Sequence, residues 1–450
     1  MATPTTGLSS DDRRRWGRSV RKMVPRSIHA FRLPRPAQAD PLATIAAQNR
    51  NRLATLVPER NARMARSPLA FFLGNPKIMA DDLAGTLSSG LAVQICGDAQ
   101  LANFGLFDAA DRSLVFDIND YGEAALGPWE WDVKRLAVSF AITARDRGCA
   151  AAEVRAAAQK PVAVYRNAMA RFAQMSYLDA WHARVPIDGV RAIVEGNDPR
   201  RRHLEGRSQS RTPRSLIVDV NGAPRIAPRP PDVVPLWRLS SGDRPDALTR
   251  DVEDVFARYR HNLAPSRRVL LERYEPIEAA GTAVGISGIG IPTFALLLIG
   301  RDGRDRVLLE LKRASASVLE DEFAGVGSPG QRFVSGQRLM QAVDDPFLGW
   351  AQSQSGDHYS VHRVPEMRVT WDVERGSPKR LRRYAKLCGW ALARAHARSG
   401  DVPAIAGYLG GSDSFDRAIA DFAESYADQN ERDYALFLEA ISTGRVSIEG

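Results

Sequence analysis

The sequence contains few cysteines and no long apolar run. Its three cysteines, Cys96, Cys149 and Cys388, are odd in number and lack the paired spacing of a metal site. This argues against a disulfide-stapled fold or a cysteine-bound zinc, and we expect a reducing cytoplasm. No apolar stretch has the length needed to cross a membrane, and no apolar signal core follows the arginines of residues 13–18, so we expect no export.

The sequence also contains fewer acidic than basic residues. The 450 residues include 62 Lys and Arg against 53 Asp and Glu, which gives a net charge of +9. A basic chain can suit a nucleic-acid partner, but these arginines are spread along the whole length and no nucleic-acid reading motif accompanies them. We therefore expect solvated basic faces and no nucleic-acid binding.

The pattern along the chain predicts an α+β protein with two lobes. Residues 1–40, rich in Arg, Pro and Ser, are expected to form a basic flexible arm. Helical periodicity predicts a helical lobe over 41–274, and helices over 373–450 complete it. Between them, β-rich runs flank the turn "GRDGRD", which predicts a small antiparallel-sheet lobe over 275–372.

The stretch "ICGDAQLANFGLF", residues 95–107, has the composition of a phosphotransfer loop. Asp98 and Asn103 are five residues apart, which is the Asp-to-Asn spacing of the kinase catalytic loop. Phosphoryl transfer needs an acid that receives the hydroxyl proton and oxygen ligands for Mg²⁺. Asp98 would then be the catalytic base and Asn103 a metal ligand, although a simple turn between two strands explains the same residues.

A second run, "FDINDYGEAALGPWEWDVKRLA" at 116–137, contributes further carboxylates. Asp120 ends a predicted strand and can meet Asn103 across a Mg²⁺ ion, with Asp117 as a second acidic ligand. Asp132 lies on the first turn of the helix that follows. Each has a plain structural interpretation, since Asp120 precedes a glycine in a turn and Asp132 is favoured by the helix dipole.

These two runs resemble motifs of known kinases. "GDAQLANFG" and "INDYGEAALGPWEWDVKRLA" look like the "HGDxHxxN" and "IDFxxAxxGDPxxDLA" motifs of aminoglycoside phosphotransferases and other small-molecule kinases of the protein-kinase-like fold. Cys96 and Gln100 stand where those kinases carry histidines, which leaves the proton acceptor and the metal ligands in place.

More closely, the chain from about residue 60 to 435 resembles the bacterial family called domain of unknown function 2252. The matching runs include "GQRFVSGQRLMQAVDDPFLGW", "LARAHARSGD" and "YADQNERDY". The resemblance to kinases implies a kinase-like two-lobed fold, with ATP and Mg²⁺ as the nucleotide and metal of a transferase.

The expected nucleotide-binding residues lie downstream of the catalytic loop. "VGISGIG", residues 284–290, precedes two β-rich runs, and Lys312 lies late in the second run. We expect backbone amides around Gly285, Ser287 and Gly290 to cover the phosphates, with Ser287 in place of the middle glycine of a kinase loop. Lys312 would bind the same phosphates.

In ordinary kinases this lobe comes before the catalytic loop, so its position here suggests a circular permutation. The helix that ends in "LARAHARSG" resembles the one that precedes the catalytic loop in small-molecule kinases, but here it lies near the C-terminus. Its His396 is expected to be structural. Glu320 is the expected acidic partner of Lys312.

Other functions stay open at this level. A nucleotidyl transferase would use the same groups with the nucleotide reversed, and a pseudokinase scaffold would bind a nucleotide or an acidic partner without catalysis. The sequence does not identify the acceptor, which could be a small molecule or a protein. The arginines of the Pro- and Gly-rich segment 197–235 suit an anionic acceptor, and a solvated face explains them equally well.

Overall fold

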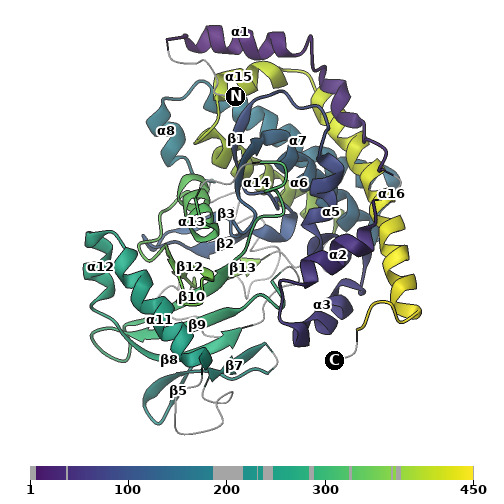
Figure 1. Ribbon diagram of the computed structural model, residues 1–450. Helices are drawn as coiled ribbons and strands as arrows, with labels where there is room; N and C mark the ends of the chain where they lie inside the picture. The colour runs from purple at the N-terminus through teal and green to yellow at the C-terminus, as the bar shows by residue number, and fades with distance from the viewer. Residues whose placement is uncertain are drawn as a thin grey trace.

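The computed structural model combines helices with small antiparallel sheets, which confirms the α+β class (Figure 1). It describes residues 7–36, 39–185, 216–230, 232–236, 247–282, 288–323, 327–365, 368–370 and 377–448. Within these ranges no helix is long and apolar enough to cross a membrane.

The larger lobe is mainly helical. Its helices are α1 (Ser10–Val20), α2 (Pro41–Asn49), α3 (Val57–Met64), α4 (Pro68–Gly74), α5 (Pro76–Leu83), α6 (Trp129–Asp146), α7 (Ala151–Phe172), α8 (Tyr177–His182), α14 (Pro378–Ala397), α15 (Val402–Leu409) and α16 (Ser414–Ser442). Its 3₁₀ turns are η1 (Arg26–Ala30), η2 (Ala54–Leu56) and η3 (Leu101–Asn103). The short strands β1 (Ala92–Ile95) and β4 (Ala125–Pro128) pair, and β13 (Arg368–Thr370), β2 (Phe104–Asp108) and β3 (Leu114–Ile118) form a second sheet.

The smaller lobe is built on a six-stranded antiparallel sheet in the order β11-β12-β10-β9-β8-β7. Its elements are β5 (Ile217–Val220), β6 (Ala223–Ile226), β7 (Val233–Pro235), α11 (Ala247–Asn262), α12 (Pro265–Leu271), β8 (Glu275–Thr282), β9 (Thr293–Ile299), β10 (Arg306–Ala314), α13 (Pro329–Met340), β11 (Gly349–Gln352) and β12 (His358–Arg363).

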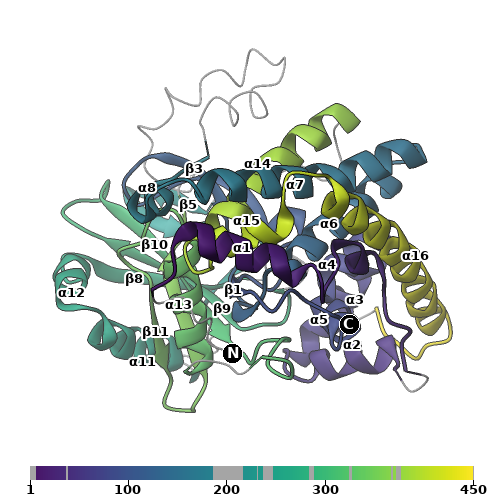
Figure 2. The same ribbon diagram turned by 90° about the horizontal axis from the view of Figure 1, so that it is seen from above.

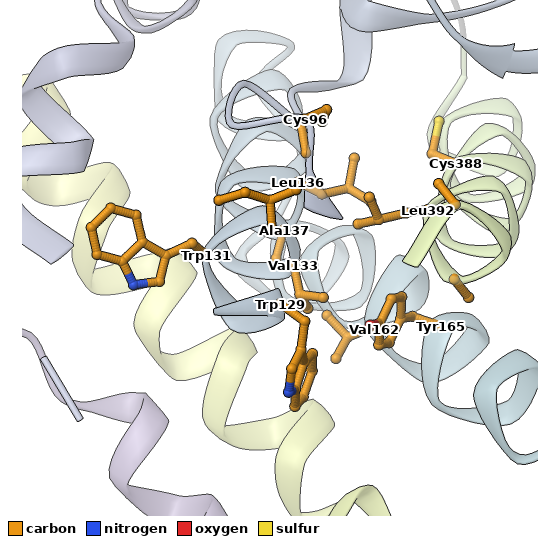
Figure 3. Close-up of a cluster of buried hydrophobic side chains, with 14 of the residues drawn as sticks. Cys96, Trp129, Trp131, Val133, Leu136, Ala137, Val162, Tyr165, Cys388 and Leu392 are labelled. Carbon is orange, nitrogen blue, oxygen red and sulfur yellow. The ribbon is translucent and has the colours of Figure 1, made fainter. Parts of the chain in front are cut away.

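Helix α6 forms the centre of the large lobe and is buried from Trp129 to Ala144. Figure 3 shows its Val133 and Leu136 packed toward α7 and toward Leu392 of α14. A helix buried on all sides must pair its polar groups, and Glu130 accepts a hydrogen bond from the amide of Ser89 at 2.7 Å. Truncation of a buried leucine in such a core costs about 2–5 kcal/mol.

The N-terminal segment is folded against the large lobe, which differs from the expected flexible arm. Helix α1 begins with a capping box in which Ser9 and Asp12 satisfy each other's backbone amides. It runs beside α15 (Figures 1 and 2), so close that a Cβ atom on Gly17 would lie 1.9 Å from the carbonyl oxygen of Ala404. The arginine-rich composition suggested disorder. Packing of α1 against α15, however, offsets the conformational entropy that the segment loses when it is ordered.

The small lobe begins earlier than the expected residue 275. Strand β7 pairs with β8, with Val233 opposite Thr282. Helices α11 and α12 cover one face of the sheet, where Val255 and Tyr259 pack in the same cluster as Leu296 and other sheet residues. Helical periodicity predicts that a helix has an apolar face, but it does not show which partner covers that face. The boundary expected at residue 275 therefore differs from the one in the structure.

The register of β10 decides which side chains of the sheet face the large lobe. Leu309 and Leu311 pack in the cluster under α11. Because side chains alternate along a strand, Lys312 points to the opposite face. Its cross-strand neighbours are Thr293 of β9 and Ser360 of β12. This face meets the loops that follow β1 and β3.

Candidate active site

The two acidic loops predicted from the sequence lie side by side because β2 and β3 form a hairpin. Phe104 pairs with Ile118, and the amide of Asn119 donates to the carbonyl of Asn103 at 3.0 Å. The Asp98-to-Asn103 loop enters this hairpin and Asp120 leaves it, so the residues meet at one end.

Asp98 is buried and held by two partners. Its carboxylate accepts a hydrogen bond from Nε of Arg135 at 2.9 Å and from Nδ2 of Asn103 at 3.0 Å. Burial raises the pKa of Asp98 to about 6, and the charge of Arg135 works against that rise. A carboxylate that titrates this close to neutrality is well matched to receive a proton.

A cavity of about 420 Å³ lies between the two lobes, with Asp98 on its wall. Most of its lining comes from four regions: α2 and the turn after it, α5, the acidic loops, and β10 with the segment after it. Ile291, Phe333 of α13 and Ser360 of β12 complete it. The charged residues among them are Arg52, Lys77, Asp81, Asp98, Asp120, Glu123, Lys312, Arg313, Glu320 and Asp321.

Lys312 and Asp120 meet inside this cavity. Nζ of Lys312 lies 3.6 Å from Oδ2 of Asp120, and the other carboxylate oxygen of Asp120 accepts from the amide of Gly122 at 2.9 Å. The charge of Asp120 raises the pKa of Lys312 against the opposing effect of burial, so the ammonium stays charged at neutral pH. The structure thus joins the predicted lysine to a predicted metal ligand.

Asp120 lines the cavity and is the residue that could hold a Mg²⁺ ion together with phosphate oxygens. Within the described ranges no group of three or more His, Cys, Asp and Glu side chains could hold a metal. Mg²⁺, however, is usually held by one or two carboxylates together with substrate phosphates and water. Asn103 is not on the cavity wall, and Nδ2 makes both of its hydrogen bonds to Asp98, so these contacts hold Asp98 in place. The role of Asn103 as a metal ligand stays a prediction.

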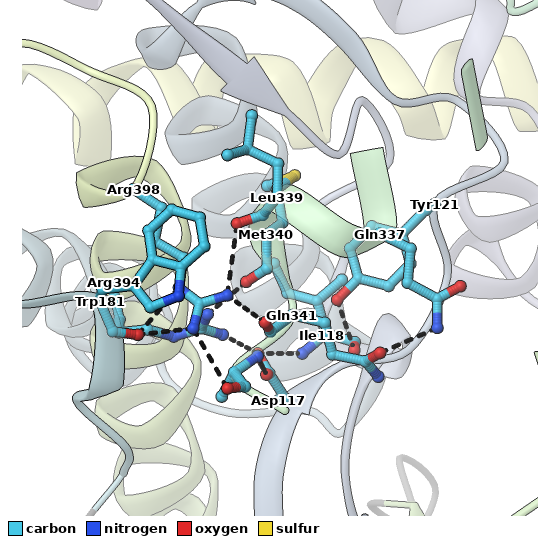
Figure 4. A network of polar contacts seen from close by, with 11 residues as sticks. Asp117, Ile118, Tyr121, Trp181, Gln337, Leu339, Met340, Gln341, Arg394 and Arg398 are labelled. Atoms are coloured by element: carbon cyan, nitrogen blue, oxygen red, sulfur yellow. Dashed lines mark hydrogen bonds and ion pairs between the residues drawn. The ribbon is translucent and has the colours of Figure 1, made fainter. Parts of the chain in front are cut away.

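Asp117, the other predicted acidic ligand, does not reach the cavity. Figure 4 shows its carboxylate within a polar network, where it pairs with Arg394 and accepts from the amide of Ala342 at 2.7 Å. Its side chain is fully buried. We therefore remove Asp117 from the set of metal ligands, because its charge is already neutralised by a buried arginine.

Glu320 lines the cavity but is not the partner of Lys312. Its Oε1 accepts from the amide of Ser317 at 3.0 Å and lies 3.7 Å from Nε of Arg332 on α13. Besides Asp120, the large lobe contributes Glu123 as a second acid that raises the pKa of Lys312. The sequence reasoning missed Glu123, although it lies only three residues after Asp120.

The predicted glycine-rich loop is described only in part. Gly285 and Ser287 lie outside the described residues. Gly290 adopts a left-handed φ of +80°, and its carbonyl accepts from the amide of Leu53 at 2.8 Å. The loop reaches the cavity through Ile291.

Asp132 holds the backbone of the loop that carries Asp98. One of its carboxylate oxygens accepts from the amide of Cys96 at 2.8 Å, and the other accepts from the amide of Gly97 at 3.0 Å. His396 lies 3.1 Å from the same carboxylate and 2.9 Å from the hydroxyl of Tyr165. His396 is therefore buried within a chain of hydrogen bonds and has the expected structural role. Asp132 lies on the first turn of α6 and also fixes the loop before Asp98.

The comparison with known families confirms the resemblance to the bacterial family of unknown function. The chain belongs to the family described as "Uncharacterized protein conserved in bacteria (DUF2252)", which matches residues 52–440. Neither a curated protein nor a solved structure matches the chain.

Proposed function

We propose that this chain is an ATP- and Mg²⁺-dependent phosphotransferase with a circularly permuted, kinase-like fold, acting on a hydroxyl-bearing acceptor. One observation carries the proposal: Lys312 from the sheet and Asp120 from the large lobe lie 3.6 Å apart in a cavity that Asp98 also lines. A phosphotransferase needs a cation on the phosphates, a carboxylate on the metal and an acid on the acceptor hydroxyl. Lys312 comes from a part of the sequence distant from the two aspartates.

The order of the elements supports the permutation. In a protein kinase the glycine-rich loop and the strand-borne lysine come first in the chain, and the catalytic loop follows. Here the loop with Asp98 comes first, and Lys312 follows on β10. The register of β9 and β10 places Lys312 opposite Thr293, close to the end of the predicted glycine-rich loop.

Each residue then has a role that its contacts allow. Asp98 orients the acceptor hydroxyl and takes its proton, while Arg135 and Asn103 fix the carboxylate. Lys312 binds phosphate oxygens on the sheet side of the cavity, and Asp120 is the acidic metal ligand. Bound Mg²⁺ would neutralise charge on the phosphates. Because the ammonium of Lys312 and the carboxylate of Asp120 already lie close together, these two groups need little reorganisation during the transfer.

The first experiment measures nucleotide binding. The melting temperature of the purified protein is titrated with ATP, with and without Mg²⁺, alongside the variants Lys312→Met and Lys379→Met. We expect Mg²⁺-dependent stabilisation of the wild type and of Lys379→Met, whose lysine is exposed on α14, but not of Lys312→Met. No stabilisation of the wild type would contradict the proposal.

The second experiment identifies the transferred group. ATP labelled at the α- or the γ-phosphate is supplied with candidate acceptors, and product label is counted. Label from the γ-phosphate on product supports phosphoryl transfer. Label from the α-phosphate would replace the proposal with nucleotidyl transfer, and Mg²⁺-dependent binding without ADP release or label on product would replace it with a pseudokinase.

A further inference from the structure

One wall of the catalytic cavity comes from a part of the chain that the kinase-like motifs do not include. The end of α2 and the turn after it contribute Gln48, Asn51 and Arg52 to the lining. Figure 2 shows α2 with α5 on the large lobe, and α5 adds Lys77 to the same cavity. This wall lines the same cavity as Lys312 and contributes the cations Arg52 and Lys77.

The turn after α2 is hydrogen-bonded to the end of the glycine-rich loop and to β10. The guanidinium of Arg52 donates to the carbonyl of Ile289, and the amide of Leu53 donates to the carbonyl of Gly290 at 2.8 Å. The carbonyl of Asn51 accepts from Arg313 at the end of β10. Arg52 is thus held at the edge of the loop predicted to cover the phosphates.

Gly290 provides the space that Arg52 occupies. A Cβ atom on Gly290 would lie 3.0 Å from Cβ and 3.5 Å from Cγ of Arg52, and the φ of Gly290 is +80°. Any other residue at this position would be strained and would push the arginine stem away. The absence of a side chain at Gly290 therefore leaves room for the stem of Arg52.

Arg52 shares its electrostatic environment with the catalytic groups. Burial lowers the pKa of Arg52 to about 10, and the charge of Glu123 opposes this fall. Glu123 also acts on the pKa of Lys312 and of Asp98. All four groups line the same cavity, and Arg52 keeps its charge at neutral pH.

We propose that Arg52 is a catalytic residue that binds the terminal phosphate of the nucleotide opposite Lys312. The inference rests on the proposed function and extends it with a residue from outside the kinase-like motifs. A guanidinium can bind two phosphate oxygens at once, whereas an ammonium acts as a point charge. In some GTP-hydrolysing proteins an arginine supplied within the same chain stabilises the charge of the transferring phosphoryl group, and such an arginine raises kcat by about 10³–10⁵-fold.

The test compares Arg52→Gln and Arg52→Lys with Arg50→Gln. Arg50 is exposed two residues away, so its replacement removes the same charge without touching the cavity. We expect Arg52→Gln to lower kcat/KM for ATP by about 100-fold or more, and to weaken ATP binding more than ADP binding. Arg50→Gln should match the wild type in both measurements.

Two outcomes would overturn the inference: Arg52→Gln with the activity of Arg50→Gln, or an equal loss of ATP and ADP affinity with kcat unchanged. If Arg52→Gln does not fold, Arg52→Lys decides, because it keeps the charge but not the forked donors; we expect a loss of about 10-fold or more, and full activity overturns the inference. Lack of any Mg²⁺-ATP turnover by the wild type would count against the proposed function itself.

Discussion

Lys312 on strand β10 and Asp120 after strand β3 form an ion pair at 3.6 Å across the boundary between the two lobes. Both side chains are mostly buried, with exposed fractions of 20% and 27%. A partly buried pair that lines a cavity is unlike an exposed surface pair, because removal of one partner leaves the other charge poorly solvated.

Replacement of Asp120 by asparagine should weaken Mg²⁺-dependent nucleotide binding. The variant keeps the shape of the side chain and its acceptor for the Gly122 amide, but it loses the negative charge that attracts the metal. We expect isothermal titration to show at least a tenfold loss of ATP affinity with Mg²⁺ and little change without it. Unchanged Mg²⁺-dependent affinity would exclude Asp120 as the metal ligand.

Replacement of Asp98 by asparagine should stop turnover while ATP still binds. An asparagine cannot accept the hydroxyl proton, and loss of a general base costs about 10²–10⁴-fold in rate. ADP release and ATP affinity are measured on the same preparation. A variant that keeps full kcat would show that Asp98 is not the base.

The rate should fall at acidic pH through the titration of Asp98. Burial raises the pKa of this carboxyl from 3.8 to about 6, so the ionised form that accepts a proton is lost as the pH falls through that value. We expect kcat/KM to fall about tenfold per pH unit below pH 6, since kcat/KM reports the free enzyme. Arg135→Met removes the positive charge that opposes the rise and should move this acidic limb to higher pH. A limb near pH 4 in the wild type would refute this assignment.

Asp132→Asn should lower kcat more than it changes the affinity for ATP. The asparagine can accept only one of the two amide bonds from Cys96 and Gly97, and its NH₂ group faces a second donor. The loop that carries Asp98 then loses its fixed position. Steady-state kinetics with ATP binding as a control separates this effect from simple unfolding.

Gly17→Ala should release helix α1 from α15. The added methyl group would collide with the backbone of Ala404, whereas the same change at Gly411 meets open space. Limited proteolysis should cut the N-terminal segment of Gly17→Ala faster than that of Gly411→Ala. Equal rates would show that the close packing of α1 is not required for docking.

The sequence predicted the features that depend on local pattern and missed those that depend on distant partners. The hairpin around "GRDGRD", the strand with Lys312 and the acidic loops could all be predicted, because turn residues and alternation are local signals. The docking of α1 could not, because it depends on a close contact between Gly17 and a helix nearly 400 residues away.

The same distinction applies to the site. Asp98, Asp120 and Lys312 lie around one cavity as the motifs suggested. Asp117 and Glu320 are carboxylates of the expected type in the expected segments, but their arginine partners come from α14 and α13. Only the fold shows that these charges are already engaged.

The most direct test is a crystal structure of the protein with Mg²⁺ and a non-hydrolysable ATP analogue. The account predicts phosphate oxygens within hydrogen-bonding distance of Nζ of Lys312 and a metal ion bound to the carboxylate of Asp120. A nucleotide bound outside this cavity, with the Lys312–Asp120 pair unchanged, would contradict it.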